Sequence, residues 1–237
     1  MYHLLHVGLG PLGQRVIADL HRRGLGRSVA AVDPAFERRD LGEVVPGAAR
    51  GVLVRSSLEE VTEWDRIRCA VVTTRSDLEL CMDTFRALLV RGCSVVSTCE
   101  ELAWPWLRHP VLAQELHELA LRGRARIVGT GINPGFLMDA LPVALSSACH
   151  SVRALRIERI QDARKRRLPF QAKVGVGLTL PEFERRVAAR TLRHVGLGES
   201  LHFLAHYLGW RIERWEETIV PVLAERALAS ELGAVPA

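Results

Sequence analysis

The sequence predicts an α/β protein in which a doubly wound parallel sheet is followed by a smaller α+β domain. Over about the first 135 residues, short runs rich in Val and Ile alternate with amphipathic segments of helical length. Strands that are apolar throughout and flanked by helices are typical of a parallel sheet covered on both faces. The alternation stops after Pro134. We therefore predict one domain over residues 1–135 and a second over residues 136–237.

The first domain is expected to contain six strands with helices between them. The strand pattern lies at His3–Val7, Val29–Val32, Gly51–Val54, Cys69–Thr73, Ser94–Thr98 and Arg126–Gly129. The helical pattern lies at Pro11–Arg23, Leu58–Trp64, Asp77–Arg91 and Val111–Arg122. Two helices carry capping-box spacing, Ser57 with Glu60 and Ser76 with Glu79, which satisfies the first amides of a helix. Gly92 is placed to end the third helix.

The second domain is predicted to be a partial α+β unit that serves substrate binding or oligomerisation. Helices are expected over Gly135–Ala148, Pro181–Ala189 and Ser200–Leu208, and strands over Val152–Gln161 and Ile212–Val222, with a polar basic segment at Asp162–Arg167. A sheet of two strands is a poor independent unit. Either a second copy of the chain completes this sheet, or the chain stops short of a full domain. We therefore expect self-association, as a homodimer.

Composition excludes several classes of protein. Hydrophobic residues make up 48% of the 237 and charged residues 25%, which excludes a disordered or fibrous chain. Neither a signal peptide nor an apolar membrane span is recognisable, so we expect a cytoplasmic protein without a membrane or nucleic-acid partner. The five cysteines form no C-x-x-C pair and are expected to be reduced. His202 and His206 have the spacing of metal ligands but lack a third ligand nearby, so no metal is predicted.

A glycine-rich motif, G-x-G-x-x-G, follows the first strand and opens the first helix. Its glycines permit a tight turn, let a pyrophosphate approach the backbone, and allow the helix and strand to pack closely, while the helix N-terminus offers free N–H groups to the anion. The motif predicts a Rossmann domain that binds a dinucleotide. The expected contacts in the motif are Gly8, Gly10, Pro11, Leu12 and Gly13.

An acidic residue, Asp33, ends the second strand twenty residues beyond Gly13. Its carboxylate can accept hydrogen bonds from an adenosine ribose and would repel a 2′-phosphate, which favours NAD. Arg38 and Arg39 lie just downstream and could reverse that preference. The predicted cofactor is therefore NAD or NADP.

Polar residues end the later strands, at the edge where ligands of open parallel sheets gather. Thr73 and Thr74 follow the fourth strand, and Glu100 and Glu101 follow the fifth, beside the aromatic sequence Leu-Ala-Trp-Pro-Trp. A carboxylate in an apolar pocket has a raised pKa, which suits proton transfer near neutral pH. Acidic residues at a helix start are the competing interpretation. The glycine-rich stretch at Gly129–Gly135, which contains Asn133, indicates either a close approach to a ligand or a plain turn.

Several motifs together resemble the dihydrodipicolinate-reductase-like dehydrogenases, and within them the 2,4-diaminopentanoate dehydrogenase and native amine dehydrogenase group. The resemblance covers nearly the whole chain. The matching segments are VGLGPLG at Val7–Gly13, VVTTRSDLELC at Val71–Cys81, VVSTCEELAWPW at Val95–Trp106, GTGINPGFLMDALP at Gly129–Pro142, RIQDARKRRLPFQAKVGVGLT at Arg159–Thr179 and HVGLGESLHFLAHYLGW at His194–Trp210.

The resemblance implies a nicotinamide-dependent enzyme that interconverts an amine and a carbonyl compound plus ammonia. It also implies that a carboxylate of the Cys-Glu-Glu-Leu segment is catalytic, either Glu100 or Glu101. Asn133 and Pro134 would lie against the cofactor. The implied substrate pocket comprises Trp104, Ile132, Phe136 and Leu137.

Two other functions are compatible with the sequence. One is a reductase of a cyclic imine, of the dihydrodipicolinate reductase type, although the Glu-Glu-Leu-Ala-Trp-Pro-Trp segment fits the amine reaction better. The other is a non-catalytic dinucleotide-binding protein, since members of the resembled family continue well beyond Ala237.

Overall fold

The computed structural model describes residues 2–163, 168–192, 195–226, 228–230 and 233–235. Its centre is a sheet of six parallel strands in the order β3-β2-β1-β4-β5-β6. The strands are β1 (Tyr2–Val7), β2 (Gly26–Val32), β3 (Val54–Arg55), β4 (Cys69–Val72), β5 (Ser94–Ser97) and β6 (Ile127–Gly129). This is the Rossmann strand order, with its topological switch point between β1 and β4.

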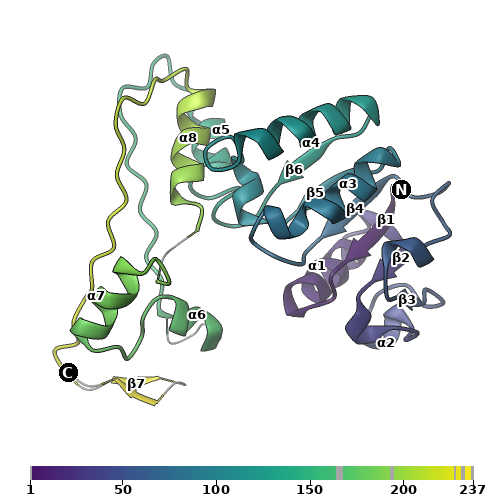
Figure 1. Cartoon of the computed structure of the whole chain (residues 1–237), viewed down its shortest axis with the longest axis horizontal. Coiled ribbons are helices and arrows are strands. Elements are labelled where there is room, and N and C mark those ends of the chain that lie inside the picture. The colour runs from purple at the N-terminus through teal and green to yellow at the C-terminus, as the bar shows by residue number, and fades with distance from the viewer. Residues whose placement is uncertain (1, 164–167, 193–194, 227, 231–232, 236–237) are drawn as a thin grey trace.

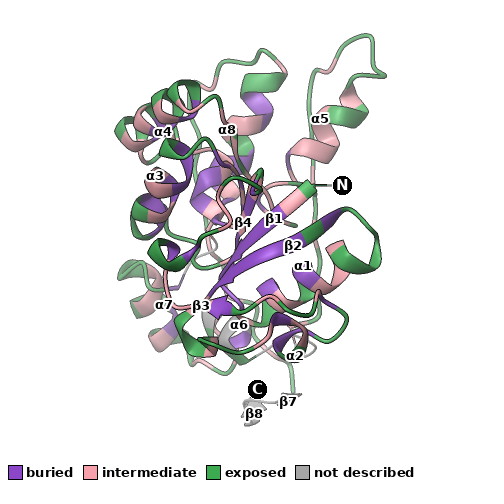
Figure 2. Ribbon diagram, turned by 90° about the vertical axis from the view of Figure 1, so that its right-hand side faces the viewer, coloured by how far each residue is buried: buried purple, intermediate pink, exposed green. Residues whose placement is uncertain are grey.

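Helices cover both faces of the sheet (Figure 1). They are α1 (Pro11–Arg22), α2 (Leu41–Val44), α3 (Met82–Val90) and α4 (Pro110–Arg122). Two separate apolar clusters result, because successive side chains of a strand point to opposite faces. Ala30 and Val32 of β2 join the cluster that contains Phe85 of α3, whereas Ala31 joins the cluster that contains Ile17 of α1. Figure 2 shows the buried residues concentrated along the central strands.

Three predicted features of the first half are wrong in detail. The strand expected over Gly51–Val54 is the two-residue β3, which begins only at Val54. The helix expected over Leu58–Trp64 is a single 3-10 turn, η2 (Leu58–Glu60), and Ser57 makes no side-chain cap. Glu60 instead accepts hydrogen bonds from the amide and hydroxyl of Ser56, at 3.0 and 2.6 Å. The Glu60 carboxylate thus bonds to Ser56, the residue before the expected cap, and the 3-10 turn stays short.

The third helix begins later than predicted. A 3-10 turn, η3 (Glu79–Cys81), precedes α3, and Ser76 caps neither of them. The end of α3 is as predicted: Gly92 has φ +70°, and the amides of Gly92 and Cys93 bond to the carbonyls of Leu89 and Leu88 at 2.9 and 3.0 Å. This is the pattern of a Schellman motif, which requires the left-handed glycine.

The second half contains four helices among its described residues: α5 (Ala140–Ser146), α6 (Leu168–Lys173), α7 (Leu180–Ala188) and α8 (Leu197–Tyr207). Helix α5 starts five residues later than predicted, since Asp139 caps it by accepting from the Ala140 amide. Helix α8 packs against α5 and against a 3-10 turn of the first half, η4 (Glu100–Ala103). Helix α6 was not predicted.

The two strands predicted for the second domain, Val152–Gln161 and Ile212–Val222, are extended chain that joins no sheet within the described residues. Both segments cross from the α5 and α8 end of the molecule to the α6 and α7 end (Figure 1). The described sheet of this half is a hairpin of β7 (Leu228–Ser230) and β8 (Gly233–Val235). Strand-like sequence forms a ladder only where a partner strand is adjacent.

Part of the predicted features lies outside the described residues, namely Arg164–Arg167 of the basic segment and His194. Within the described part of the chain, no helix combines the length and apolarity that crossing a bilayer needs.

Candidate functional site

The three glycines of the first loop have three different structural roles. Gly8 holds the turn with φ +94°. Gly13 is in tight packing, because a Cβ there would lie 2.2 Å from the Gly8 carbonyl oxygen and 2.6 Å from Thr73 Oγ1. Gly10 is extended, with φ −62° and ψ 175°, and a Cβ there would meet nothing within 4 Å. The tight turn is thus at Gly8, and the open approach to the backbone is at Gly10.

The N-terminal end of α1 faces the open space at Gly10. Pro11 occupies the first helical position, and the first backbone bond of the helix runs from the Gln14 amide to the Gly10 carbonyl at 3.0 Å. The amides of Leu12 and Gly13 therefore precede the helical hydrogen-bond ladder. Free N–H groups at the positive end of a helix suit an anion such as a diphosphate.

Asp33 braces the same loop. Its Oδ2 accepts from the Leu9 amide at 2.6 Å, and its Oδ1 accepts from the Ala35 amide at 2.9 Å. A carboxylate has about four lone-pair positions. Asp33 can therefore stabilise the loop and still accept from a ribose.

Arg38 lies beyond Asp33 on the surface. Its side chain is 90% exposed, and its backbone is left-handed with φ 62°. Together with Arg55, Glu37 and Glu60 it lines a cavity of about 380 Å³ beside β3. Both charges are present here, so either an adenosine ribose or its 2′-phosphate could find a partner.

Thr73 and Thr74 contact the glycine loop directly. The Thr73 hydroxyl donates to the Gly8 carbonyl at 2.8 Å, and the Thr74 methyl would lie only 2.9 Å from a Cβ on Gly8. The Thr74 hydroxyl is 3.8 Å from the sulfur of Cys81. These two residues therefore hold the loop at the switch point.

The thiols of Cys81, which contacts Thr74, and of Cys99 form a buried pair. A hydrogen bond from the Cys99 thiol lowers the pKa of Cys81 to about 7. The Cys99 sulfur also lies 3.2 Å from the Ser76 carbonyl oxygen. This pair joins the segment after β4 to the residue that precedes Glu100.

Glu100 and Glu101 lie in η4, directly after β5, but their environments differ. Glu101 is buried at 5% exposure, and its Oε2 accepts from the Leu78 amide at 2.9 Å and lies 3.0 Å from His109 Nε2. Glu100 is half-buried, with one carboxylate oxygen shielded from solvent. The carboxylate of Glu101 is therefore engaged within the protein scaffold.

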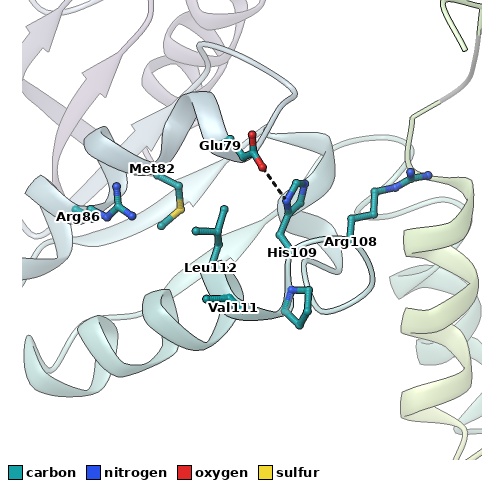
Figure 3. Close-up of a pocket in the computed structure, with 8 residues that line it drawn as sticks. Glu79, Met82, Arg86, Arg108, His109, Val111 and Leu112 are labelled. Atoms are coloured by element: carbon teal, nitrogen blue, oxygen red, sulfur yellow. Dashed lines mark ion pairs between the residues drawn. The ribbon is translucent and has the colours of Figure 1, made fainter.

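His109 lies at the start of α4 and was missed by sequence reasoning, which had no signal for its partner eight positions earlier. Its Nδ1 is 3.6 Å from Glu79 Oε1, so the imidazole lies between two carboxylates. Figure 3 shows Glu79 and His109 pointing toward each other at a cavity of about 420 Å³, which Met82 and Leu112 also line.

The loop after β6 is held by a buried carboxylate. Asp139 accepts from the Gly135 amide and from the Ser200 hydroxyl of α8, each at 2.7 Å. Pro134 packs against Gly196. Asn133 Oδ1 is buried and has no hydrogen-bond partner among the described residues. Asp139 and Ser200 were also missed, although an Asp just before a helical run is a recognisable cap.

The predicted substrate-pocket residues are divided between two environments. Trp104 packs on α8. Its ring centroid lies 4.9 Å from the ring centroid of His206 and 6.0 Å from that of Phe203. Ile132, Phe136 and Leu137 are exposed at the surface. Met138, the next residue, lines a cavity of about 660 Å³ between α8 and the two extended segments.

The two histidines of α8 make ordinary contacts. His202 Nδ1 donates to the Gly198 carbonyl at 2.9 Å, and His206 packs on Trp104.

A part-buried ion pair links the two halves. Arg108 Nε lies 2.6 Å from Glu199 Oε1 of α8, and the Glu199 side chain is fully buried. Arg108 also lines the cavity of Figure 3, where its side chain extends toward that helix.

The strand order and the glycine loop define a protein of the Rossmann class. Comparison with known proteins indicates which members of this class the chain resembles. Residues 136–236 match the family model of the 2,4-diaminopentanoate dehydrogenase C-terminal domain. The 2,4-diaminopentanoate dehydrogenase of Acetoanaerobium sticklandii is 29% identical over 176 residues, which is 74% of this chain and 47% of that protein. The match therefore spans about half of the relative's length. These findings confirm the predicted resemblance: the chain is similar to the 2,4-diaminopentanoate dehydrogenases.

A solved structure shares the fold. The amine dehydrogenase from Mycobacterium smegmatis superimposes with a TM-score of 0.76 at 24% sequence identity. The superposition covers 99% of this chain and 70% of that chain. The predicted fold class, a Rossmann domain followed by a smaller unit, is confirmed.

Proposed function

We propose that the chain is an NAD(P)-dependent oxidoreductase that interconverts an amine and a carbonyl compound plus ammonia. One observation carries the proposal most. The open backbone at Gly10 and the half-buried carboxylate of Glu100 both follow the carboxyl ends of strands of one parallel sheet. A dinucleotide bound at the switch point would extend along that edge. The names of the curated relative and of the similar structure agree with this chemistry.

The residues present fit a nicotinamide dinucleotide. Gly10 and the first amides of α1 would hold the diphosphate, and Asp33 would hold the adenosine ribose. Asn133 and Pro134 would lie against the other end, where the buried Asn133 Oδ1 can accept a hydrogen bond. When bound, the nicotinamide supplies the hydride or accepts it.

Glu100 would move the protons. Ammonia addition to a carbonyl and loss of water both require proton transfers, and the iminium ion that results is cationic. A half-buried carboxylate can exchange those protons and favour the cation. Glu100 is preferred over Glu101 because the Glu101 carboxylate already accepts the Leu78 amide and bonds to His109. Trp104 and the exposed apolar residues Ile132, Phe136 and Leu137 would contact the substrate.

The test is a spectrophotometric assay of the purified chain with NADH and NADPH against small ketones and aldehydes plus ammonia. We expect turnover in the wild type and a loss of about 100- to 10,000-fold in kcat for Glu100→Gln. The affinity for the reduced cofactor, measured by its fluorescence, should stay unchanged. The matched control is Glu118→Gln, at an exposed position of α4, which should leave both quantities unchanged. Full turnover in Glu100→Gln would contradict the assigned role.

The choice of cofactor is tested by comparing the two affinities. The Asp33 carboxylate disfavours a 2′-phosphate, and the exposed Arg38 guanidinium favours it. Arg38→Ala should weaken NADPH binding and leave NADH binding unchanged. An equal loss for both cofactors would show that Arg38 does not contact the 2′-position.

A further inference from the structure

We propose that Glu101 and His109 are positioning residues that set the direction of Glu100, an inference that rests on the proposed function. Neither residue needs to touch the substrate for this role. Their effect is to fix the rotation of the 3-10 turn that carries both glutamates.

The turn η4 is tied to the segment after β4 at three points. The Glu101 amide donates to the Ser76 carbonyl at 3.2 Å, and the Glu101 carboxylate accepts from the Leu78 amide at 2.9 Å. Just before the turn, the Cys99 thiol lies 3.2 Å from the same Ser76 carbonyl. Glu101 thus contributes both its backbone and its side chain to one anchor.

A 3-10 helix has three residues per turn, so successive side chains leave it about 120° apart. Glu100 and Glu101 therefore point in different directions, and the inward direction of Glu101 determines that of its neighbour. Releasing Glu101 would let the single turn rotate or unwind, since so short a 3-10 segment has little stability of its own.

His109, at the start of α4, holds the Glu101 carboxylate by a further contact. Its backbone is fixed, because its amide donates to the Pro105 carbonyl at 2.9 Å and its carbonyl accepts from the Ala113 amide at 2.8 Å. A carboxylate accepts hydrogen bonds, so the proton lies on His109 Nε2 and points at Glu101. Glu79 lies on the other side of the ring, toward the cavity in Figure 3. The imidazole therefore holds the Glu101 carboxylate at the start of α4, beside Glu79 of η3.

The experiment compares His109→Ala with His109→Gln in the full chain. We expect His109→Ala to lower kcat about 100-fold, which is the cost of misplacing a reacting group by about 1 Å. The dissociation constant of the reduced cofactor should change by less than about twofold, because the glycine loop is elsewhere. His109→Gln should restore most of kcat, since its side-chain amide can still donate to Glu101. The control is His117→Ala, an exposed position on the same helix.

Unchanged kcat in His109→Ala would overturn the proposal, and so would a loss of kcat that is accompanied by an equal loss of cofactor affinity. Amide hydrogen exchange of Leu78 without cofactor provides a readout that does not depend on activity. Faster exchange at Leu78 in His109→Ala and not in His117→Ala supports the anchor, and equal exchange contradicts it. A wild type that turns over no substrate with either cofactor contradicts the proposed function, and the exchange result still decides on the anchor.

Discussion

The two halves of the molecule satisfy their strand-forming sequences in opposite ways. In the first half, every strand pairs with a neighbour and the apolar residues form two closed clusters. In the second half, two segments of similar character run extended without joining a sheet among the described residues, and Ile160 and Val222 are 94% and 96% exposed. A strand-forming sequence thus indicates which side chains need burial, whereas the presence of a pairing strand depends on the rest of the fold.

The largest effect should come from the most crowded point of the first half. Gly13→Ala places a methyl group 2.2 Å from a backbone carbonyl, so β1 and α1 must separate. We expect loss of cofactor binding and destabilisation by about 3 kcal/mol, measured by fluorescence titration and denaturant unfolding. Gly10→Ala is the matched variant: with open space around its Cβ it should fold normally and lose cofactor binding alone. Equal stability of Gly13→Ala and wild type would contradict the packing.

The next effect concerns the junction between the halves. Arg108→Met leaves the buried Glu199 carboxylate without its charge partner, and we expect a loss of about 3 kcal/mol in unfolding free energy. The double variant Arg108→Met with Glu199→Met removes both charges and should recover much of that loss. Denaturant unfolding of the single and double variants measures the difference. If the two variants are equally unstable, the ion pair does not join the halves.

A smaller, pH-dependent effect tests the interior of the first sheet. Burial lowers the pKa of His6 from 6.5 to about 4, while Nε2 bonds to the Ser28 hydroxyl at 2.9 Å. Between about pH 6.5 and pH 4, the unfolded chain therefore binds a proton at His6 that the folded chain does not bind. The associated stability is complete above pH 6.5 and is lost as the pH falls toward 4, by about 2 kcal/mol between pH 7 and pH 5. His6→Gln should flatten this slope in denaturant unfolding, and an unchanged slope would contradict the assignment.

The smallest effect on stability is expected in the extended segments. Ile160→Lys and Val222→Lys alter almost fully exposed side chains, so unfolding free energy should change by less than about 0.5 kcal/mol. If, as we propose, a second copy of the chain covers these segments, both variants should reduce self-association in light scattering. A mass that corresponds to a monomer for the wild type would contradict the proposed homodimer.

The residues of the candidate site could be proposed from the sequence because their signals are local. The glycine motif, Asp33 and Glu100 each follow a strand, and the strands of a parallel sheet end at one edge. The separation of Glu100 from Glu101 could not be predicted, since it depends on Leu78 and His109, which come from other elements. The hydrogen bond from the Ser200 hydroxyl to the Asp139 carboxylate spans 61 positions and has no sequence signal.

The amino-acid pattern was enough to predict the parallel sheet, the alternation of its strands with helices along the first half, and the position of the glycine loop, because periodicity and glycine conformation act over a few residues. Three features emerge only from the folded chain: which glutamate is held inside the protein, which glycine is open to a ligand, and the extended course of the strand-like segments in the second half. Each of these depends on which groups from distant positions come within contact distance, and local pattern carries no such information.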